Sequence, residues 1–388
     1  MSSVDSDAEE PELDLSNSDV VTKYKAAADI CNRALAAVVA ECVDGRSIVE
    51  LCNRGNTMMD ELVSKVFKGK DVEKGVAFPT CISVNNCAGH FCPLESDAAV
   101  KNGDVVKIDL GCHIDGFIAV QAHTIVVQPD PKVPITGRAA DVIAAAQTCF
   151  EAALRLVRPG KSVAEVPGPL QAIAESFGCN LLEGVMSHQL KRFVIDGNKC
   201  VLNRPSPEAR VEDGEFEVNE VYAIDIVVST GDGKARILDE KETTIYKRAL
   251  DMEYHLKMKA SRTVFGEINK RFPTMPFTVG ALSDPRTMRL GLVECLNHGL
   301  LHPYPVMYER NGELVAQVKA TVLLMPNGSD RVTVAPQQVV QSEKKVEDPE
   351  VLELLKSGYK TKKKKKGGKK GGGEEGAGQA SAATTSGA

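Results

Sequence analysis

The sequence lacks the segments that would place a chain in or across a membrane. No apolar run approaches the ~18–20 residues that span a bilayer, and residues 1–16 lack the apolar core that a signal peptide needs. Eleven cysteines are present, yet no two form a Cys-x-x-Cys pair, which argues against a zinc site built from cysteine. We therefore expect a soluble intracellular protein whose thiols are reduced and mostly buried.

The charge of the chain is divided unevenly. Residues 356–388 hold nine Lys against two Glu, a net charge of +7, which leaves −13 on the rest of a chain whose total is −6. Residues 1–16 contain six acids and no base, and we expect them to form a disordered leader. A basic tail on an acidic body indicates that the tail touches an anionic partner.

The spacing of apolar residues predicts a mixed set of helices and strands between the two ends. Helices are expected over 18–43, 47–67, 138–158, 162–178, 253–271 and 284–298, and a short one around 351–355. Strands are expected over 105–112, 117–127, 219–229 and 313–326. Ser47 and Glu50 form a capping-box pattern at the start of the second helix.

One strand motif occurs twice. Asp104-Val-Val-Lys-Ile-Asp109 and Glu220-Val-Tyr-Ala-Ile-Asp225 share the pattern acid-Val-x-x-Ile-Asp, and each follows two predicted helices. Two apolar strands that end in Asp can arise by chance, but the shared order of elements favours an internal duplication.

Six stretches of the chain, taken in order, resemble type 2 methionine aminopeptidases. They are more similar still to the proliferation-associated (ErbB-receptor-binding) proteins, a non-peptidase branch of that superfamily. The stretches are AFPTCISVNNCAGH, GDVVKIDLGCHIDGF, SHQLKRFVIDG, NEVYAIDIVVSTGDGK, HPYPVMYERNGELVAQ and TVLLMPNG.

The resemblance spans residues 17–335 and implies an α+β pita-bread fold of the methionine aminopeptidase/creatinase-like type. It implies two pseudo-symmetric halves within a domain over 17–345, with a helical insert at about 250–310. Residues 346–388 would then form a short helix and a disordered Lys/Gly-rich tail.

The aminopeptidases that the chain resembles hold two divalent ions with two Asp, one His and two Glu. Such carboxylates bridge and neutralise the ions, which activate a water and clamp the attacked carbonyl. On this chain the first Asp is Asp109, the second falls at Val120, and the His is His188. The first Glu falls at Asp225 and the second at Lys319.

The altered ligands form a degenerate pocket in which the charges no longer suit metal ions. Asp109, Asp225 and a protonated Lys319 sum to −1, against the +4 of two dications. A like charge about 4 Å away costs about 4 kcal/mol per unit charge at an effective dielectric of about 20. We therefore expect no metal, no cofactor and no aminopeptidase activity, and we expect Lys319 to pair with both acids because a buried carboxylate needs a partner.

His90 matches a family histidine that contacts substrate near the metals. With the metals lost, we interpret His90 and His188 as satisfied or cleft-lining side chains, with a peptide contact as the alternative for His90. A Cys87/His90 nucleophile is a further alternative, but no third, orienting group can be identified.

Lys-rich segments are the predicted RNA-binding residues. A Lys run attaches to nucleic acid through phosphates, independently of sequence and in a salt-sensitive way, or acts as a nuclear address. A solubilising tail and plain solvated faces are the alternatives. The predicted residues are Lys360, Lys362, Lys363, Lys364, Lys365, Lys366, Lys369 and Lys370 in the tail, and Lys257, Lys259, Arg262, Lys270 and Arg271 in the insert. Lys65, Lys68, Lys70 and Lys74 form a weaker cluster.

The resemblance further implies binding to RNA, ribosomes and pre-ribosomal particles, and control of translation, ribosome biogenesis and growth. It implies a location in cytoplasm, nucleus and nucleolus, with possible nuclear protein partners and no membrane partner, and we favour a monomer. One alternative is a protein-interaction scaffold or transcriptional coregulator. Residues 351–355 nearly match the Leu-x-x-Leu-Leu helix that docks in coregulator grooves. The other alternative is an active metallo-aminopeptidase.

Overall fold

A single large β-sheet forms the centre of the molecule. A computed structural model of the chain describes residues 13–69, 71–204 and 214–360. In these residues the nine-stranded sheet has the order β1-β3-β4-β13-β8-β6-β7, with β14 paired to β13 and β5 to β8. The strands are β1 (Lys74–Val84), β3 (Val105–Ile114), β4 (Phe117–Val126), β5 (Asn180–Leu181), β6 (Met186–Leu190), β7 (Cys200–Leu202), β8 (Val221–Ser229), β13 (Val315–Met325) and β14 (Gly328–Arg331).

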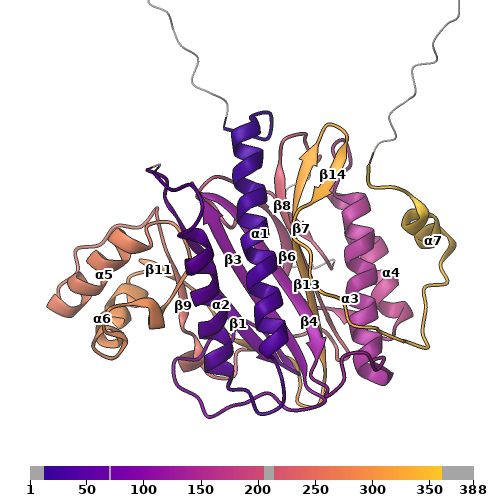
Figure 1. The fold of residues 1–388 in the computed structure, drawn as a ribbon, viewed down its shortest axis with the longest axis horizontal. Helices are drawn as coiled ribbons and strands as arrows, with labels where there is room; N and C mark the ends of the chain where they lie inside the picture. The colour runs from indigo at the N-terminus through magenta and orange to yellow at the C-terminus, as the bar shows by residue number, and fades with distance from the viewer. Residues whose placement is uncertain (1–12, 70, 205–213, 361–388) are drawn as a thin grey trace, which may run out of the picture.

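Two pairs of helices cover the sheet (Figure 1). The first pair, α1 (Ser18–Glu41) and α2 (Ile48–Val63), packs on β1, β3 and β4 in one apolar core. The second pair, α3 (Gly137–Leu156) and α4 (Pro167–Ser176), packs with β8 and β13 in another. Each helix turns its buried apolar stripe towards the strands, as the spacing in the sequence predicts.

The two halves of the chain repeat one arrangement. The strands that carry the duplicated motif, β3 and β8, each follow a helix pair, and β4 and β13 pair with each other where the halves meet. This is the α+β, two-halved arrangement that the resemblance implies. None of the described helices is long and apolar enough to cross a bilayer.

The insert is not purely helical, and this corrects the prediction for residues 250–310. A three-stranded sheet of β10 (Phe277–Thr278), β9 (Ile245–Arg248) and β11 (Leu301–Tyr304) packs with α5 (Lys259–Arg271) and α6 (Pro285–Asn297) around a third core. Strands of two to four residues are too short to leave a periodic pattern, so the sequence did not indicate them.

Several helix ends differ from the prediction, three of them by four residues or more. Helix α4 begins at Pro167 rather than 162, because Val163–Glu165 form a separate 3-10 turn. Helix α5 begins at Lys259 rather than 253, where the carboxylate of Glu294 accepts hydrogen bonds from the amides of Lys257 (2.8 Å) and Met258 (3.1 Å). Helix α2 begins after Ser47 as expected but ends at Val63, and the Ser47 side chain makes no capping hydrogen bond.

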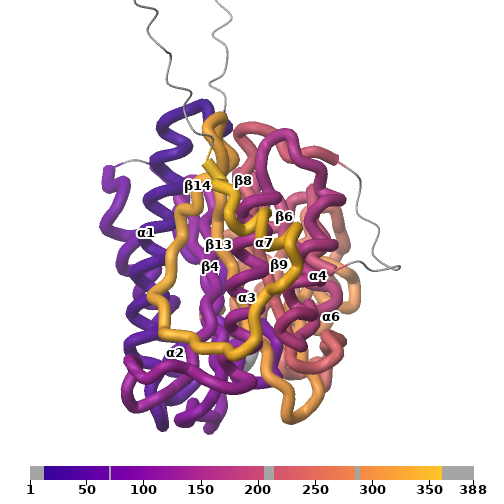
Figure 2. Tube along the Cα trace, turned by 90° about the vertical axis from the view of Figure 1, so that its right-hand side faces the viewer, coloured from indigo at the N-terminus to yellow at the C-terminus, as the bar shows by residue number. Residues whose placement is uncertain are grey.

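The C-terminal segment returns along the second helix pair (Figure 2). Val340 pairs with Ile135, and the hydroxyl of Ser342 donates to Asp141 of α3. The short helix α7 (Pro349–Lys356) then packs against this half through buried Val351. Two more short strands, β2 (Cys87–Gly89) and β12 (Met307–Tyr308), pair with each other.

Candidate functional site

Strand pairing brings the predicted pocket residues into one row across the middle of the sheet. Asp109 of β3 lies opposite Ala122 of β4, Ala122 lies opposite Lys319 of β13, and Lys319 lies opposite Asp225 of β8. Residues separated by two hundred positions therefore meet because neighbouring strands of the two halves are in register. Val120 precedes Ala122 by two residues, so its side chain points to the same face of the sheet.

The ammonium of Lys319 lies between the two acids. Its Nζ is 2.7 Å from Oδ2 of Asp109 and 3.0 Å from Oδ2 of Asp225, the pairing that the sequence predicts. Burial alone would lower the pKa of Lys319, but the two carboxylates outweigh it and raise that pKa. Burial raises the pKa of Asp109 to about 6 despite the ammonium beside it. The row therefore holds a lysine ammonium between the carboxyl groups of Asp109 and Asp225.

Both carboxylate oxygens of Asp225 are engaged. Oδ2 accepts from Lys319, and Oδ1 accepts from Nε2 of Gln317 at 2.9 Å. The backbone around it is also held, because Asn203 donates to its carbonyl at 2.6 Å and its amide donates to Ser187 at 3.0 Å. An ion bound here would have to displace two side chains from Asp225.

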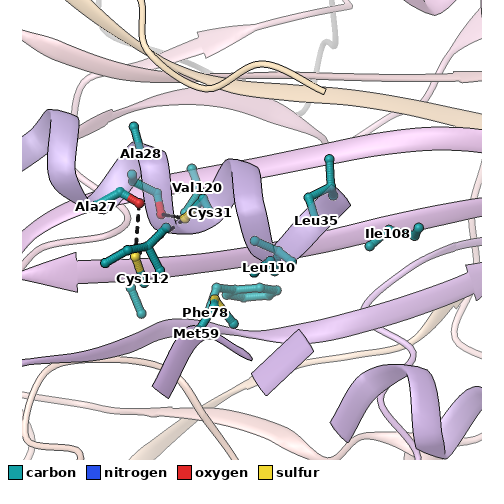
Figure 3. Close-up of a cluster of buried hydrophobic side chains, with 14 of the residues drawn as sticks. Ala27, Ala28, Cys31, Leu35, Met59, Phe78, Ile108, Leu110, Cys112 and Val120 are labelled. Carbon is teal, nitrogen blue, oxygen red and sulfur yellow. Dashed lines mark hydrogen bonds between the residues drawn. The ribbon is translucent and has the colours of Figure 1, made fainter. Parts of the chain in front are cut away.

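Val120 fills its position with methyl groups. It is 3% exposed and belongs to the first apolar core, part of which Figure 3 shows. Its backbone amide and carbonyl bond the hydroxyl of Thr321 at 2.8 and 3.0 Å. Across the hairpin lies Gly111, where an added Cβ would approach Val120 Cγ1 to 2.8 Å. The hairpin is therefore shaped around a valine at this position.

The two histidines lie beside the row. His90 has a positive φ of 65°, and its Nδ1 is 3.0 Å from the carbonyl of Pro305. Burial lowers the pKa of His90 to about 4 and also lowers the pKa of His188, so both rings are neutral at pH 7. His90 contacts Pro305 rather than Cys87, whose thiol pKa is raised by burial. This geometry gives no support to a Cys87/His90 nucleophile.

These residues line a cavity of about 270 Å³. Five of the six predicted pocket residues line it, and the sixth, Asp109, contacts the lining residue Lys319. The other walls are mostly apolar and were not assigned from the sequence: Phe78, Leu182, Val185, Met186 and Tyr304. The rings of Phe78, His90 and Tyr304 contact one another with centroids 5.4–5.8 Å apart. Phe78 and Tyr304 do lie within the stretches AFPT and HPYP that carry the resemblance, which was the available signal.

The donor set does not fit two metal ions. Of five expected ligands, one position offers only methyl groups and another an ammonium that already occupies the space between the remaining acids. Across the residues that the structure describes, no group of three or more His, Cys, Asp or Glu side chains is arranged to hold a metal. No catalytic step through a metal can be built on these residues.

The predicted basic residues of the insert divide into two kinds. All five are exposed, but Arg262 donates to the carbonyls of Leu256 and Lys257, and Arg271 pairs with Glu267 at 2.6 Å. Their guanidiniums are therefore partly engaged by the protein itself.

Lys257, Lys259 and Lys270 have no acidic partner within the described part of the chain, and they remain available to an anion. In the weaker cluster, Lys74 turns inward and donates to the carbonyl of Val66, while Lys65 and Lys68 are exposed. Lys70 lies outside the described residues.

The base of the tail is fixed to the body. Arg155 donates to Ser357 and Arg158 to Gly358, while Lys360 lies 3.4 Å from Asp330. The other predicted tail residues, Lys362–Lys366, Lys369 and Lys370, lie outside the described residues. Figure 1 places α5 and α6 at one side of the molecule and α7 at the other, so the insert and α7 lie on opposite sides of the central sheet.

Comparison with known proteins gives a consistent result. Residues 22–244 match metallopeptidase family M24. A protein named ErbB-3 binding protein 1 from Solanum tuberosum is 57% identical over 364 residues, 93% of this chain and 93% of that protein. Proliferation-associated protein A from Dictyostelium discoideum is 46% identical over 355 residues, 90% of this chain and 92% of that protein.

A solved structure, that of a thermophilic Arx1, has the same fold. Its TM-score is 0.84 at 30% identity, covering 89% of this chain and 100% of the other. Together with the sequence matches, this confirms the pita-bread fold that the resemblance implies.

Proposed function

The chain belongs to metallopeptidase family M24, in the branch of the proliferation-associated and ErbB-3-binding proteins, and from this premise we propose that it is a non-peptidase that binds RNA on ribosomes or pre-ribosomal particles. Its fold is that of an aminopeptidase, whereas its pocket has exchanged metal ligands for an internal ion pair. Function then has to come from its surfaces rather than from the pocket's former chemistry.

One observation carries the non-peptidase half of the proposal. The ammonium of Lys319 lies 2.7 Å from Oδ2 of Asp109 and 3.0 Å from Oδ2 of Asp225, so it pairs with both acids without a metal, although Oδ1 of Asp109 has no hydrogen-bond partner among the described residues. Cleavage by a two-metal site needs ions that activate water and polarise the scissile carbonyl. A lysine held in its protonated form supplies neither a base nor a site for a second ion.

Metal content and peptidase activity test this half. We expect purified full-length protein to retain no stoichiometric Co, Mn or Fe after dialysis, measured by mass spectrometry of the elements, and to leave Met-initiated peptides uncleaved. An active methionine aminopeptidase prepared in the same way serves as the positive control. One or two tightly held ions per chain together with turnover would overturn the non-peptidase assignment.

The RNA-binding half rests on local charge. The body is acidic, so it repels phosphate except where lysines gather. Lysines are concentrated in the sequence of the tail, and Lys257, Lys259 and Lys270 of the insert are exposed without acidic partners among the described residues. Contacts of this kind neutralise phosphates and release counterions, so the affinity falls as salt rises.

Sedimentation with ribosomes across a salt series tests the RNA-binding half. We would compare the intact chain, a chain ending at Lys360, and a full-length chain with Lys362–Lys366, Lys369 and Lys370 changed to Gln. Ending at Lys360 keeps the residues that Arg155, Arg158 and Asp330 hold. We expect both altered chains to lose most co-sedimentation near physiological salt and to show a shallower salt dependence.

Unchanged sedimentation of both altered chains would contradict a role for the tail. A variant with Lys257, Lys259 and Lys270 changed to Gln then asks whether the insert makes the contact. If that variant also sediments like the intact chain, the RNA-binding proposal fails. The three lysines are exposed, so their replacement should leave folding intact.

The wider role follows from this proposal. We propose that the protein regulates translation, ribosome biogenesis and growth as a monomer in the cytoplasm, nucleus and nucleolus. A second candidate function is a protein-interaction scaffold or transcriptional coregulator. The apolar cavity of about 270 Å³ favours it, because concave apolar sites with a few polar groups are where proteins hold ligands.

A further inference from the structure

A second cavity, of about 910 Å³, lies between α2 and the insert. Two thiols from different parts of the chain line it: Cys52 of α2, and Cys92 in the segment after β2. Its walls also include Arg271 and Arg289, so the cavity is polar and wide enough to admit small reactive molecules. This cavity shares no lining residue with the one around Lys319.

The surroundings of Cys92 favour its thiolate. Its sulfur interacts with the thiol of Cys52 and lies 3.9 Å from the hydroxyl of Thr278. Hydrogen bonding from Cys52, and from Thr278 and Thr244, outweighs burial and lowers the pKa of Cys92. The same interaction raises the pKa of Cys52, so the pair favours a thiolate at Cys92 over one at Cys52.

Another thiol pair shows that closeness alone does not create such a site. Cys31 and Cys112 have sulfurs 3.6 Å apart, and both are fully buried in the first apolar core. Their thiols donate to the carbonyls of Ala119 and Ala27, and Figure 3 shows the bond from Cys112 to Ala27. Burial raises the pKa of Cys112 well above its usual range, which disfavours a thiolate there.

We propose that Cys92 is a modification site that reacts with hydroperoxides, with Cys52 as its resolving thiol. The Cys92 thiolate attacks the peroxide, so an S–O bond forms, the O–O bond breaks, and water or alcohol leaves. The Cys52 sulfur then attacks the Cys92 sulfenic acid, an S–S bond forms, and a second water leaves. Two thiols are oxidised and one hydroperoxide is reduced, and the product links α2 to the segment after β2.

Peptide mapping of the full-length chain tests this proposal. Reduced protein would be titrated with hydrogen peroxide, alkylated, digested and analysed by mass spectrometry for each of the eleven cysteines. We expect Cys92 to be oxidised at least about tenfold faster than thiols whose pKa burial raises, since each pKa unit is about a tenfold change in thiolate fraction. The first disulfide should join Cys52 to Cys92.

Variants separate the two roles. In C52S the sulfenic acid of Cys92 should persist and be trapped by a dione reagent, whereas in C92S neither the trapped adduct nor the disulfide should form. C112S removes the enclosed pair and should leave the oxidation of Cys92 unchanged.

Three results would overturn the proposal: a Cys31–Cys112 disulfide that forms as fast as Cys52–Cys92, earlier oxidation of the less buried Cys200, or no oxidation of Cys92. The proposal does not depend on RNA binding.

Discussion

Positions 120 and 319 lie in one pocket, and both lack the ligand that the resemblance expects, but they lack it in different ways. At position 120 a carboxylate is replaced by methyl groups, and the surrounding core closes on them. At position 319 a carboxylate is replaced by an ammonium that takes over the role of the ions themselves. The first change removes a charge, and the second reverses one.

The difference shows how a metal site can be lost without unfolding its protein. Deleting a ligand alone would leave the remaining acids crowded and unpaired in a buried place. The cation at 319 neutralises the acids that remain, and the valine at 120 lowers the number of acids that need a cation. The side chains at positions 319 and 120 should therefore contribute by different amounts to the free energy of unfolding, and substitutions at each position measure those amounts.

Lys319→Met should have the largest effect. It leaves Asp109 and Asp225 buried without their cation, and breaking a buried ion pair in this way typically costs about 3–5 kcal/mol. We expect a loss of this size in the free energy of unfolding, measured by urea denaturation at pH 7.

Two controls accompany this variant. Lys259→Met removes an exposed lysine and should change stability by less than about 0.5 kcal/mol. Adding Asp109→Asn and Asp225→Asn to Lys319→Met should recover much of the loss, because no unpaired charge then remains. A Lys319→Met protein as stable as the wild type would show that the ammonium is not needed.

Val120→Asp should have the next largest effect. It restores a carboxylate to a position that is 3% exposed, beside a row whose net charge is already −1. We expect a destabilisation of about 2–4 kcal/mol, from lost packing and an unpaired buried charge. Val120→Asn is the control of similar size, and a Val120→Asp protein as stable as that control would contradict the argument from charge.

Gly111→Ala tests how closely the hairpin fits Val120. The added Cβ would lie 2.8 Å from Val120 Cγ1 and 3.0 Å from the carbonyl of Ala119, so a neighbour has to move. Overpacking of this kind costs about 1–3 kcal/mol. A double-mutant cycle with Val120→Ala should show that the two changes are coupled, since the smaller side chain relieves part of the clash. Additive effects would show that Val120 is not the residue in conflict.

Lys319 and His90 respond to burial in opposite ways. The pocket stabilises the protonated form of Lys319, whereas it disfavours the protonated form of His90. His90 has its pKa lowered by burial to about 4, below the value of about 6.5 in an unfolded chain. The unfolded state therefore binds the proton first, so the contribution is complete above pH 6.5 and is lost as the pH falls towards 4.

As the pH decreases from 6.5 to 5, we expect protonation of His90 in the unfolded state to lower the free energy of unfolding by about 1–2 kcal/mol. His90→Asn should show a shallower decline by that amount in denaturation curves at a series of pH values. Asp109 opposes this trend, because its raised pKa favours the folded state at acid pH. An unchanged slope in His90→Asn would mean that His90 can be protonated in the folded protein.

Much of the central sheet and of the pocket could be predicted from the sequence. The spacing of apolar residues indicates the long helices and strands. The resemblance, applied position by position, predicts that Asp109, Asp225 and Lys319 belong to one site. Charge alone then predicted their pairing. These predictions succeeded because they depend on patterns over many residues or on a strong local imbalance.

What the sequence did not indicate depends on contacts between distant residues. The start of α5 is set by Glu294, some thirty-five positions after it, rather than by a local cap. The aromatic wall of Phe78, His90 and Tyr304 is assembled from two strands and a turn. The Cys52–Cys92 pair likewise joins segments that no spacing rule relates.

The ion pair at Lys319 also has a consequence for reversibility. Changing Val120 back to Asp adds an acid to a row with one cation, and changing Lys319 to Glu leaves three acids with none. Each single step towards the metal-binding arrangement therefore passes through a less stable protein, although the two steps together would restore a set of carboxylates that ions can neutralise. The loss of folding stability at each single step therefore opposes a return to the metal-binding arrangement.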